Sequence, residues 1–336
     1  MDYERFKEKL MEILTTMIPK DATLHLQSVT KNNQVHLDGL AILSPNSNIS
    51  PTIYLNYYYD DFLNQFYNLD EEETKIQELK LQEYLVTIAT TILKIHNENL
   101  PTENFSVSFF KDFEKIRSKI VFKLVNYEKN RDLLRGIPHI PYLDLAIVFL
   151  CFLDSQFGQN ATILITNEHL KLWKVLDREL YEIAILNTPC LLPEEFCTME
   201  ALIENLMEIT DLPDSNLPNQ QFIQDVIKDS NYLESSSFPN KNGSMYVLSN
   251  HSKLFGASCI LYQNLLKKIS EHFSSSLYIL PSSIHEVIII PSNDCSSLSQ
   301  FTQMVQEVNE TQLSAEEILS DHAYFYDESK KAILYT

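Results

Sequence analysis

The sequence predicts an α+β fold of two to three domains, built from mainly antiparallel hairpins that alternate with helices. Segments with alternating apolar and polar residues, typical of strands, come in closely spaced pairs, and segments with helical periodicity separate these pairs. Hydrophobic residues make up 44% of the chain, which is enough for an extensive core. With 336 residues the chain also exceeds the usual size of a single domain.

Residues 1–100 are predicted to form an N-terminal α+β domain. Residues 3–17 have apolar side chains every three to four positions and predict a helix. The segments ATLHLQSV and QVHLDGLAIL predict strands joined by a turn at 31–33, and TIYLNYYY predicts a third strand. Asp70 with Glu73 resembles a capping box, so a long helix is expected to follow and to cover this sheet.

Residues 104–210 are predicted to form a middle α+β domain. The alternation in IRSKIVFKLV predicts a strand with a basic outer face, whereas LDLAIVFLCFL is apolar on both faces and predicts a central strand with ATILIT as its hairpin partner. Helices are predicted over 167–174, 178–188 and 199–209. We expect Asp177 to cap the second helix and Pro189 to end it.

Residues 211–243 are predicted to be an acidic and polar connection, and residues 244–336 a C-terminal hairpin-helix α+β domain. In the latter we expect SMYVLS to pair with LFGASCIL, LYIL with EVIII, and AYFY with AILY. Helices over 263–273 and 299–309 separate the three hairpins, and Ser297 caps the second helix.

The charge of the chain is strongly negative, since 46 acidic against 26 basic residues give a formal net charge of −20. This charge makes nucleic acid an unlikely partner and opposes binding to an anionic membrane surface. Residues 194–235 hold ten acids and one base, whereas residues 111–135 hold eight bases and four acids. The acidic segment indicates a solvated connection, a surface that docks a basic protein, or a mimic of nucleic acid.

Targeting signals and membrane segments are not predicted. The longest apolar run, Leu145 to Leu153, is shorter than the roughly 18–20 residues that a membrane-spanning helix needs. The N-terminus alternates charges where a signal peptide would be basic and then apolar. A cytoplasmic protein is therefore expected.

Metal and cofactor motifs are not predicted either. The five cysteines are odd in number and widely spaced, unlike a disulfide framework or a zinc site. The five glycines lie too far apart for a phosphate-binding loop, and no His-Glu-x-x-His occurs. Glu168 and His169 are adjacent, so on a helix they point about 100° apart, and hydrogen bonding at a helix start is expected for them.

The stretch LPSSIHEVIIIP contains the candidate functional residues. It places Ser282, Ser283, His285 and Glu286 between two apolar runs. A hydroxyl with a base in hydrogen-bond reach could act as a nucleophile, and a structural turn explains the same residues. The candidate binding or active site consists of Ser282, Ser283, His285, Glu286, Asn250, His251 and Asn187.

Several segments along nearly the full chain carry a resemblance to a known family. They include KIVFKLVNYEKN, IPHIPYLDLAIVF, YVLSNHSKLFGASCILY, LPSSIHEVIIIP and VNETQLSAEEILSD. Together they resemble a family of uncharacterised proteins from anaerobic Gram-positive bacteria, grouped as a domain of unknown function. The resemblance implies a bacterial cytosolic protein, and it implies no activity and no catalytic residues.

Three functions remain open on the sequence. The absence of familiar catalytic motifs favours a non-enzymatic protein-binding or accessory module, with a protein partner in the biology of a mobile element or its host. The alternative is a hydrolase or transferase without a familiar motif that uses the turn Ser282–Glu286. A nucleic-acid mimic in the acidic segment 194–235 ranks last, and the oligomeric state stays open.

Overall fold

The computed structural model describes residues 1–45, 50–66, 74–100, 107–153, 161–210, 245–292 and 297–335. These residues form two compact units, Met1–Ser108 with Leu153–Ala161, and Phe109–Phe152 with Thr162–Thr336. Antiparallel sheets and helices make up both, which confirms the predicted α+β class. The predicted domain boundaries stay a prediction, and the connection over 211–243 and the capping box at Asp70 lie outside the described residues.

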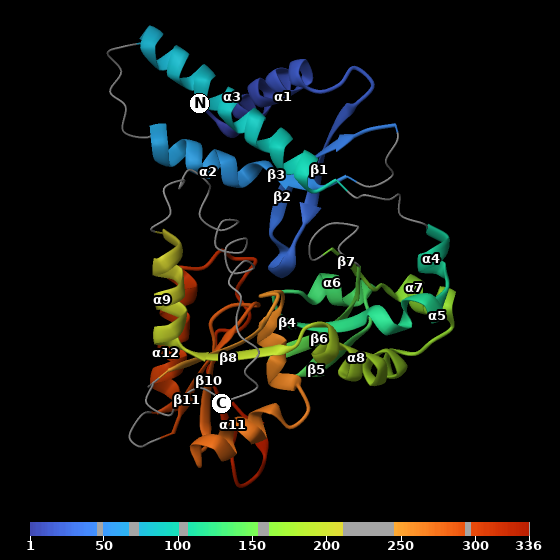
Figure 1. The fold of residues 1–336 in the computed structure, drawn as a ribbon, viewed down its shortest axis with the longest axis vertical. Helices are drawn as coiled ribbons and strands as arrows, with labels where there is room; N and C mark the ends of the chain where they lie inside the picture. The colour runs from blue at the N-terminus through green and yellow to red at the C-terminus, as the bar shows by residue number, and fades with distance from the viewer. Residues whose placement is uncertain are drawn as a thin grey trace. The chain divides into compact units, whose positions relative to one another are not determined.

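Unit 1 consists of a three-stranded antiparallel sheet and helices that cover it (Figure 1). Its elements are α1 (Tyr3–Met17), β1 (Thr23–Thr30), η1 (Asn32–Gln34), β2 (His36–Leu43), β3 (Thr52–Tyr54), α2 (Leu55–Phe66) and α3 (Thr74–Glu98). The strand order is β1-β2-β3. Apolar side chains from α1, β2, α2 and α3, such as Phe6, Leu40, Leu55 and Leu85, form its core.

The predicted third strand of unit 1 is wrong over most of its length. The segment TIYLNYYY is a strand only over Thr52–Tyr54, and α2 begins at Leu55. Leu55, Tyr58 and Phe62 are buried at helical spacing in the core of unit 1. Burial of this helical face stabilises α2 over an extended conformation.

Unit 2 contains a four-stranded and a six-stranded sheet, both antiparallel. Its elements before residue 200 are α4 (Val107–Lys111), α5 (Phe113–Ile116), η2 (Arg117–Lys119), β4 (Ile120–Asn126), α6 (Arg131–Gly136), β5 (His139–Tyr142), β6 (Leu145–Phe152), β7 (Thr162–Leu164), α7 (Asn167–Trp173), α8 (Asp177–Leu191) and β8 (Glu194–Thr198). The others are α9 (Met199–Thr210), β9 (Tyr246–Asn250), η4 (Gly256–Leu261), α11 (Leu265–Phe273), β10 (Leu277–Pro281), β11 (Val287–Pro291), α12 (Leu298–Thr311), β12 (Tyr324–Asp327) and β13 (Ala332–Leu334).

The strand order places β6 at the centre of one sheet of unit 2, and β10 and β11 at the centre of the other. In the four-stranded sheet β6 pairs with β4, β5 and β7, which confirms it as the predicted central strand and β7 as its hairpin partner. The six-stranded sheet has the order β13-β12-β10-β11-β9-β8. The predicted basic outer face of β4 is wrong, because Arg117–Lys119 precede the strand in η2 and the strand packs against both α8 and η4.

The structure corrects the predicted start and end of α8 and confirms the hydrogen bonding predicted at the start of α7. Asp177 lies in the first turn of α8, after the N-cap Leu176, and the helix continues through Pro189 to Leu191. Pro189 lies in the last turn of α8, where its missing N–H removes one helical hydrogen bond, and the helix ends two residues later. At the start of α7, His169 and Thr166 form a capping box, as expected for hydrogen bonding at a helix start.

The segment LFGASCIL forms the 3₁₀ helix η4, so the predicted hairpin with SMYVLS is wrong. Phe255 has a left-handed backbone, with φ of 55°, and turns the chain away from β9. Gly256 follows, where a Cβ atom would collide with Ser249 Oγ and His285 O. The hairpins β10–β11 and β12–β13 and the capping of α12 by Ser297 are confirmed.

Two hydroxyl groups bind the outer edge of β4. Thr188 Oγ1 of α8 accepts a hydrogen bond from the Phe122 N–H at 3.1 Å, and Ser258 Oγ of η4 accepts one from the Leu124 N–H at 3.0 Å. All four residues are buried. Side chains thus replace a further strand at this edge and satisfy its backbone donors.

Replacement of Ser258 by alanine tests this arrangement. The change leaves the buried Leu124 N–H without its acceptor, so the free energy of unfolding should fall by about 1–3 kcal/mol. Thr311→Ala is the matched control, because the Thr311 hydroxyl is exposed and binds the Glu307 carbonyl and the Gln312 amide, both within four residues of it. Urea unfolding followed by circular dichroism measures both, and equal losses in the two variants would contradict the edge-binding role.

Candidate functional site

The candidate turn Ser282–Glu286 joins strands β10 and β11. The backbone N–H groups of Ser282 and Ser283 both donate to the Glu286 carbonyl at 3.2 Å, which closes the hairpin. The Ile284 N–H donates to the Glu317 carbonyl at 2.9 Å. The backbone of the turn is therefore bound both within the hairpin and to the segment that precedes β12.

Ser283 and His285 use their polar atoms to bind backbone groups. Ser283 Oγ accepts a hydrogen bond from the His285 N–H at 2.9 Å. His285 Nδ1 lies 2.9 Å from the Lys253 carbonyl oxygen and 3.3 Å from the Phe255 nitrogen, so either tautomer has a backbone partner. The imidazole stacks on the Phe255 ring at 6.0 Å, and burial lowers the pKa of His285. These two side chains fix the turn against the loop after β9.

That loop, residues 250–256, has an unusual backbone. The Asn250 amide donates to the Leu254 carbonyl at 2.8 Å and its oxygen accepts the Leu254 N–H at 3.2 Å. Lys253 and Phe255 have φ of 50° and 55°, in the left-handed region that costs a non-glycine residue about 1–2 kcal/mol. Lys123 of β4 places its ammonium 4.4 Å from the centre of the Phe255 ring. Packing and hydrogen bonds therefore hold two strained residues beside the turn.

A charged cluster lies next to Ser282 and Glu286. Lys253 Nζ forms an ion pair of 2.5 Å with Glu195 of β8, and both side chains are largely buried. Burial raises the pKa of Glu286, whereas the charge of Lys253 and a hydrogen bond from the Ser282 hydroxyl lower it. Burial also raises the pKa of Cys197 to about 11, so this neighbouring thiol stays protonated at neutral pH.

The structure brings most of the predicted site residues together and places one elsewhere. Ser282, Ser283, His285, Glu286 and Asn250 belong to the turn and the loop that contacts it. His251 is exposed in the same loop, and its N–H donates to the Pro193 carbonyl. The amide of Asn187, on α8, instead binds the carbonyls of Arg117 and Ile120 at 2.8 and 3.1 Å. The role of these residues as a site stays a prediction.

Sequence reasoning missed Glu195, Cys197 and Lys253. Cys197 lies opposite Val247 and Glu195 opposite Ser249 in the β8–β9 ladder, and β9 in turn pairs with β11 after the turn. Glu195 and Cys197 therefore come close to the turn through strand order, and Lys253 through the loop after β9, and no short motif indicates either.

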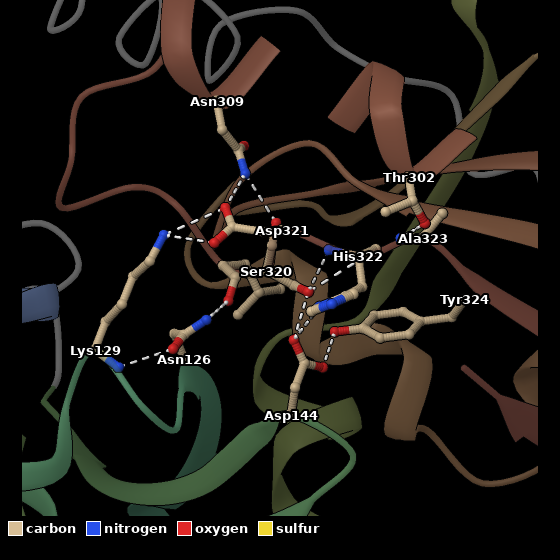
Figure 2. Close-up of polar contacts among 11 residues, drawn as sticks. Asn126, Lys129, Asp144, Thr302, Asn309, Ser320, Asp321, His322, Ala323 and Tyr324 are labelled. Carbon is tan, nitrogen blue, oxygen red and sulfur yellow. Dashed lines mark hydrogen bonds and ion pairs between the residues drawn. The ribbon is translucent and has the colours of Figure 1, made fainter. Parts of the chain in front are cut away.

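A second polar cluster surrounds Asp144, in the turn between β5 and β6 (Figure 2). Ser320 Oγ donates to Asp144 Oδ2 at 2.6 Å, the Tyr324 hydroxyl donates to Oδ1 at 2.6 Å, and His322 Nδ1 lies 3.3 Å from Oδ2. Ser320 and Tyr324 are fully buried. Burial, together with the charge of Asp144 and the hydrogen bond to it, raises the pKa of Tyr324 well above its ordinary value.

Further polar contacts bind the same segment, residues 319–324 (Figure 2). The Asn126 amide donates to the Leu319 carbonyl at 3.1 Å, and Lys129 Nζ lies 3.1 Å from an Asp321 carboxylate oxygen. From α12, the Asn309 amide donates to the Ser320 carbonyl at 2.9 Å. The four-stranded sheet is thereby joined to the segment that leads into β12.

The Asp144 cluster has the composition of a catalytic triad and a different geometry. In a triad the serine hydroxyl faces the imidazole, which accepts its proton. Here the hydroxyls of both Ser320 and Tyr324 donate to the carboxylate. No sequence pattern indicates this cluster, because Asp144 lies far along the chain from its three partners. Its geometry fits the joining of two segments.

The described residues contain neither a metal-binding group nor a membrane-spanning helix. Within the described ranges, no three or more His, Cys, Asp or Glu side chains are grouped so that they could hold a metal ion. None of the helices in the described part of the chain combines the length and the apolar character needed to cross a membrane. Cys151 and Cys259 are buried, Cys190 is exposed, and Cys295 lies outside the described residues.

Asp144→Ala tests the structural role of this cluster. It leaves the buried Tyr324 hydroxyl without its acceptor and leaves the Ser320 hydroxyl only the longer contact with the His322 carbonyl at 3.4 Å, so the free energy of unfolding should fall by about 1–3 kcal/mol. Asp132→Ala is the control, since it removes an exposed ion pair with Arg135 and should change stability by less than about 1 kcal/mol. Denaturant unfolding compares the two, and a loss at Asp144 no larger than at Asp132 would refute the role.

Comparison with known proteins identifies a family for the chain. No curated protein and no solved structure matches the chain. A family model described as a family of unknown function, DUF5688, matches residues 3–328. The match includes both the candidate turn and the Asp144 cluster. Because it covers nearly the whole chain, the chain belongs to the DUF5688 family of unknown function.

Proposed function

We propose that the chain is a hydrolase or transferase that works at the turn Ser282–Glu286. In this proposal Ser282 is the nucleophile, Glu286 is the base, and Lys253 supplies a positive charge beside that base. The supporting observation is that Ser282 and Glu286 close the same hairpin, where the Ser282 N–H donates to the Glu286 carbonyl at 3.2 Å, and that burial raises the pKa of the Glu286 carboxyl group. Ser283 and His285 bind backbone groups and take no chemical role.

The chemistry follows from this contact. A serine hydroxyl attacks an electrophilic carbon when a neighbouring base accepts its proton. The Glu286 carboxylate takes the proton as Ser282 Oγ forms its bond to the carbon, and the protonated carboxyl group then gives it to the leaving group. A raised pKa suits both steps, because proton transfer is most effective when the pKa of the base lies near the working pH.

The excess of negative charge in the cluster supports a functional role. Glu195 and Glu286 supply two carboxyl groups, and Lys253 already forms a close ion pair with Glu195. A buried carboxylate without full compensation destabilises a fold, and so do the left-handed conformations of Lys253 and Phe255. Such unfavourable features are concentrated at functional sites.

The charge of the whole chain limits the substrate. With a net charge of −20, the protein repels polyanions and favours neutral or cationic substrates. The proposed chemistry needs no cofactor. The bacterial cytosol, which the sequence resemblance implies, is the setting in which we propose that this reaction occurs.

A serine-directed fluorophosphonate probe tests the proposal without knowledge of the substrate. We expect covalent labelling of the folded chain at Ser282, because the neighbouring carboxylate accepts the hydroxyl proton. Ser282→Ala should abolish labelling, whereas Ser283→Ala should retain it. Peptide mass spectrometry measures the labelled position. An unlabelled folded chain, or labelling that persists in Ser282→Ala, would rule out Ser282 as the nucleophile.

Glu286→Gln tests the buried carboxyl group through the pH dependence of stability. Because the folded state raises this pKa, the ionised group destabilises the fold at neutral pH, and below the ordinary glutamate pKa both states hold the proton. The variant should therefore melt at a higher temperature than the unmodified chain near pH 7, and the gain should vanish as the pH falls towards about 4.

The matched control for that experiment is Glu200→Gln, which removes one negative charge from an exposed position on α9. If Glu286→Gln lowers the melting temperature at neutral pH, the carboxylate stabilises the fold and the argument from buried excess charge is wrong.

A second candidate function is a non-enzymatic protein-binding or accessory module. Its support lies on α9, where Glu200 and Glu204 are exposed one turn apart and lie beside Ile203, whose side chain is 47% exposed. An apolar group next to two carboxylates fits a basic protein partner. A folded chain that the fluorophosphonate probe does not label would favour this candidate over the enzyme.

A further inference from the structure

Strand β1 forms an open edge of the sheet in unit 1 (Figure 1). It pairs with β2 over all eight of its residues, Thr23–Thr30, and lies at the end of the strand order. Six of the eight residues are exposed, with Leu24 and Val29 partly buried. Among the described residues no further strand covers this edge.

The register identifies the backbone groups that point outwards. The Lys31 N–H donates to the Val35 carbonyl at 2.7 Å, which makes these two residues a hydrogen-bonded pair next to Thr30 and His36. Hydrogen-bonded and non-hydrogen-bonded pairs alternate along an antiparallel ladder. The odd-numbered residues of β1 therefore bind β2. The residues that direct N–H and C=O groups to the open edge are Leu24, Leu26, Ser28 and Thr30.

Contacts on the other side of β2 agree with this register. The Asp38 N–H donates to Asn56 Oδ1 at 2.7 Å, and the Ile42 carbonyl accepts the Ser50 hydroxyl at 2.9 Å. The Asp38 N–H and the Ile42 carbonyl thus point away from β1. This is expected because Asp38 and Ile42 are the partners of Ser28 and Leu24 in non-hydrogen-bonded pairs.

The edge lacks the features that usually prevent strands from pairing. Proteins protect open edges with lysine, proline, bulges or short strands. The sequence TLHLQSVT contains no lysine, proline or glycine, and its pairing with β2 is continuous. It also contains no Asp, Glu, Lys or Arg, in a chain with a net charge of −20. Two copies can therefore approach along β1 without the like-charge repulsion expected over most of the surface.

We propose that β1 pairs with β1 of a second copy of this chain, as antiparallel strands related by a two-fold axis. One register uses all the outward groups, with Leu24 opposite Thr30 and Leu26 opposite Ser28 of the other copy. In this register Gln27 lies on the axis and faces Gln27 of the other copy as a non-hydrogen-bonded pair. The two three-stranded sheets then form one continuous sheet, and each outward N–H meets an outward C=O.

The side chains of β1 suit this arrangement. Leu26 is 36% exposed, and its neighbour across the axis is the small Ser28. Opposite His25 lies Val29, which is uncharged, so no like charges meet. The symmetric contact closes after two copies, because each open edge then covers the other.

Cysteine cross-linking tests the register directly. Cα atoms of a non-hydrogen-bonded antiparallel pair lie about 4.5 Å apart, within the range of a disulfide. In a Cys190→Ser background, which removes the one exposed thiol among the described cysteines, Gln27→Cys should form a disulfide-linked dimer under mild oxidation. His25→Cys is the matched control. In the proposed register, position 25 of one copy lies about four residues, roughly 13 Å, from position 25 of the other copy, so this variant should remain uncross-linked.

Sedimentation of the unmodified chain provides the second measurement. We expect a monomer–dimer equilibrium that shifts to monomer in Leu26→Pro, because proline removes an outward N–H and leaves the pairing with β2 intact. A chain that stays monomeric at every concentration, or equal cross-linking of Gln27→Cys and His25→Cys, would overturn the proposal. Labelling of Ser282 bears only on the enzyme and leaves this result unaffected.

Discussion

The carboxylate of Asp144 is the constraint on which the arrangement of unit 2 depends. It accepts hydrogen bonds from the buried hydroxyls of Ser320 and Tyr324, and a buried hydroxyl that loses its partner costs about 1–3 kcal/mol. The segment that leads into β12 is therefore bound beside the β5–β6 turn. Because β12 pairs with β10, this contact also determines where the β10–β11 hairpin lies relative to the four-stranded sheet.

The candidate turn depends on the same segment. The Ile284 N–H, in the middle of the turn, donates to the Glu317 carbonyl, shortly before the residues that Asp144 binds. The turn is also bound from the other side by the loop after β9, through His285. A position fixed from two sides can hold the side chains of Ser282 and Glu286 in one arrangement, as a catalytic or binding site requires.

Local sequence patterns predicted most of the elements, and the failures have physical causes. The helices α1 and α12 and the hairpin β10–β11 follow from periodicity and capping within a few residues. The segment after β9 was misassigned because an apolar run does not distinguish a strand from η4, whose start depends on contacts of Gly256 with the distant turn. The same limit applies to the site. Four of its residues lie within five positions of the sequence, whereas Glu195 joins them only through strand order and Lys253 only through the loop after β9.

The two open edges of this chain show how differently the same requirement can be met. Backbone N–H groups at the outer edge of β4 bind the hydroxyls of Thr188 and Ser258, so this edge needs no other strand. At β1, no described side chain performs this role, and the strand is exposed, uncharged and continuous. Side-chain hydroxyls are present in β1 itself, so the difference does not reflect a lack of polar residues. An edge left open over eight residues in an otherwise strongly charged chain is best explained by a strand that binds there.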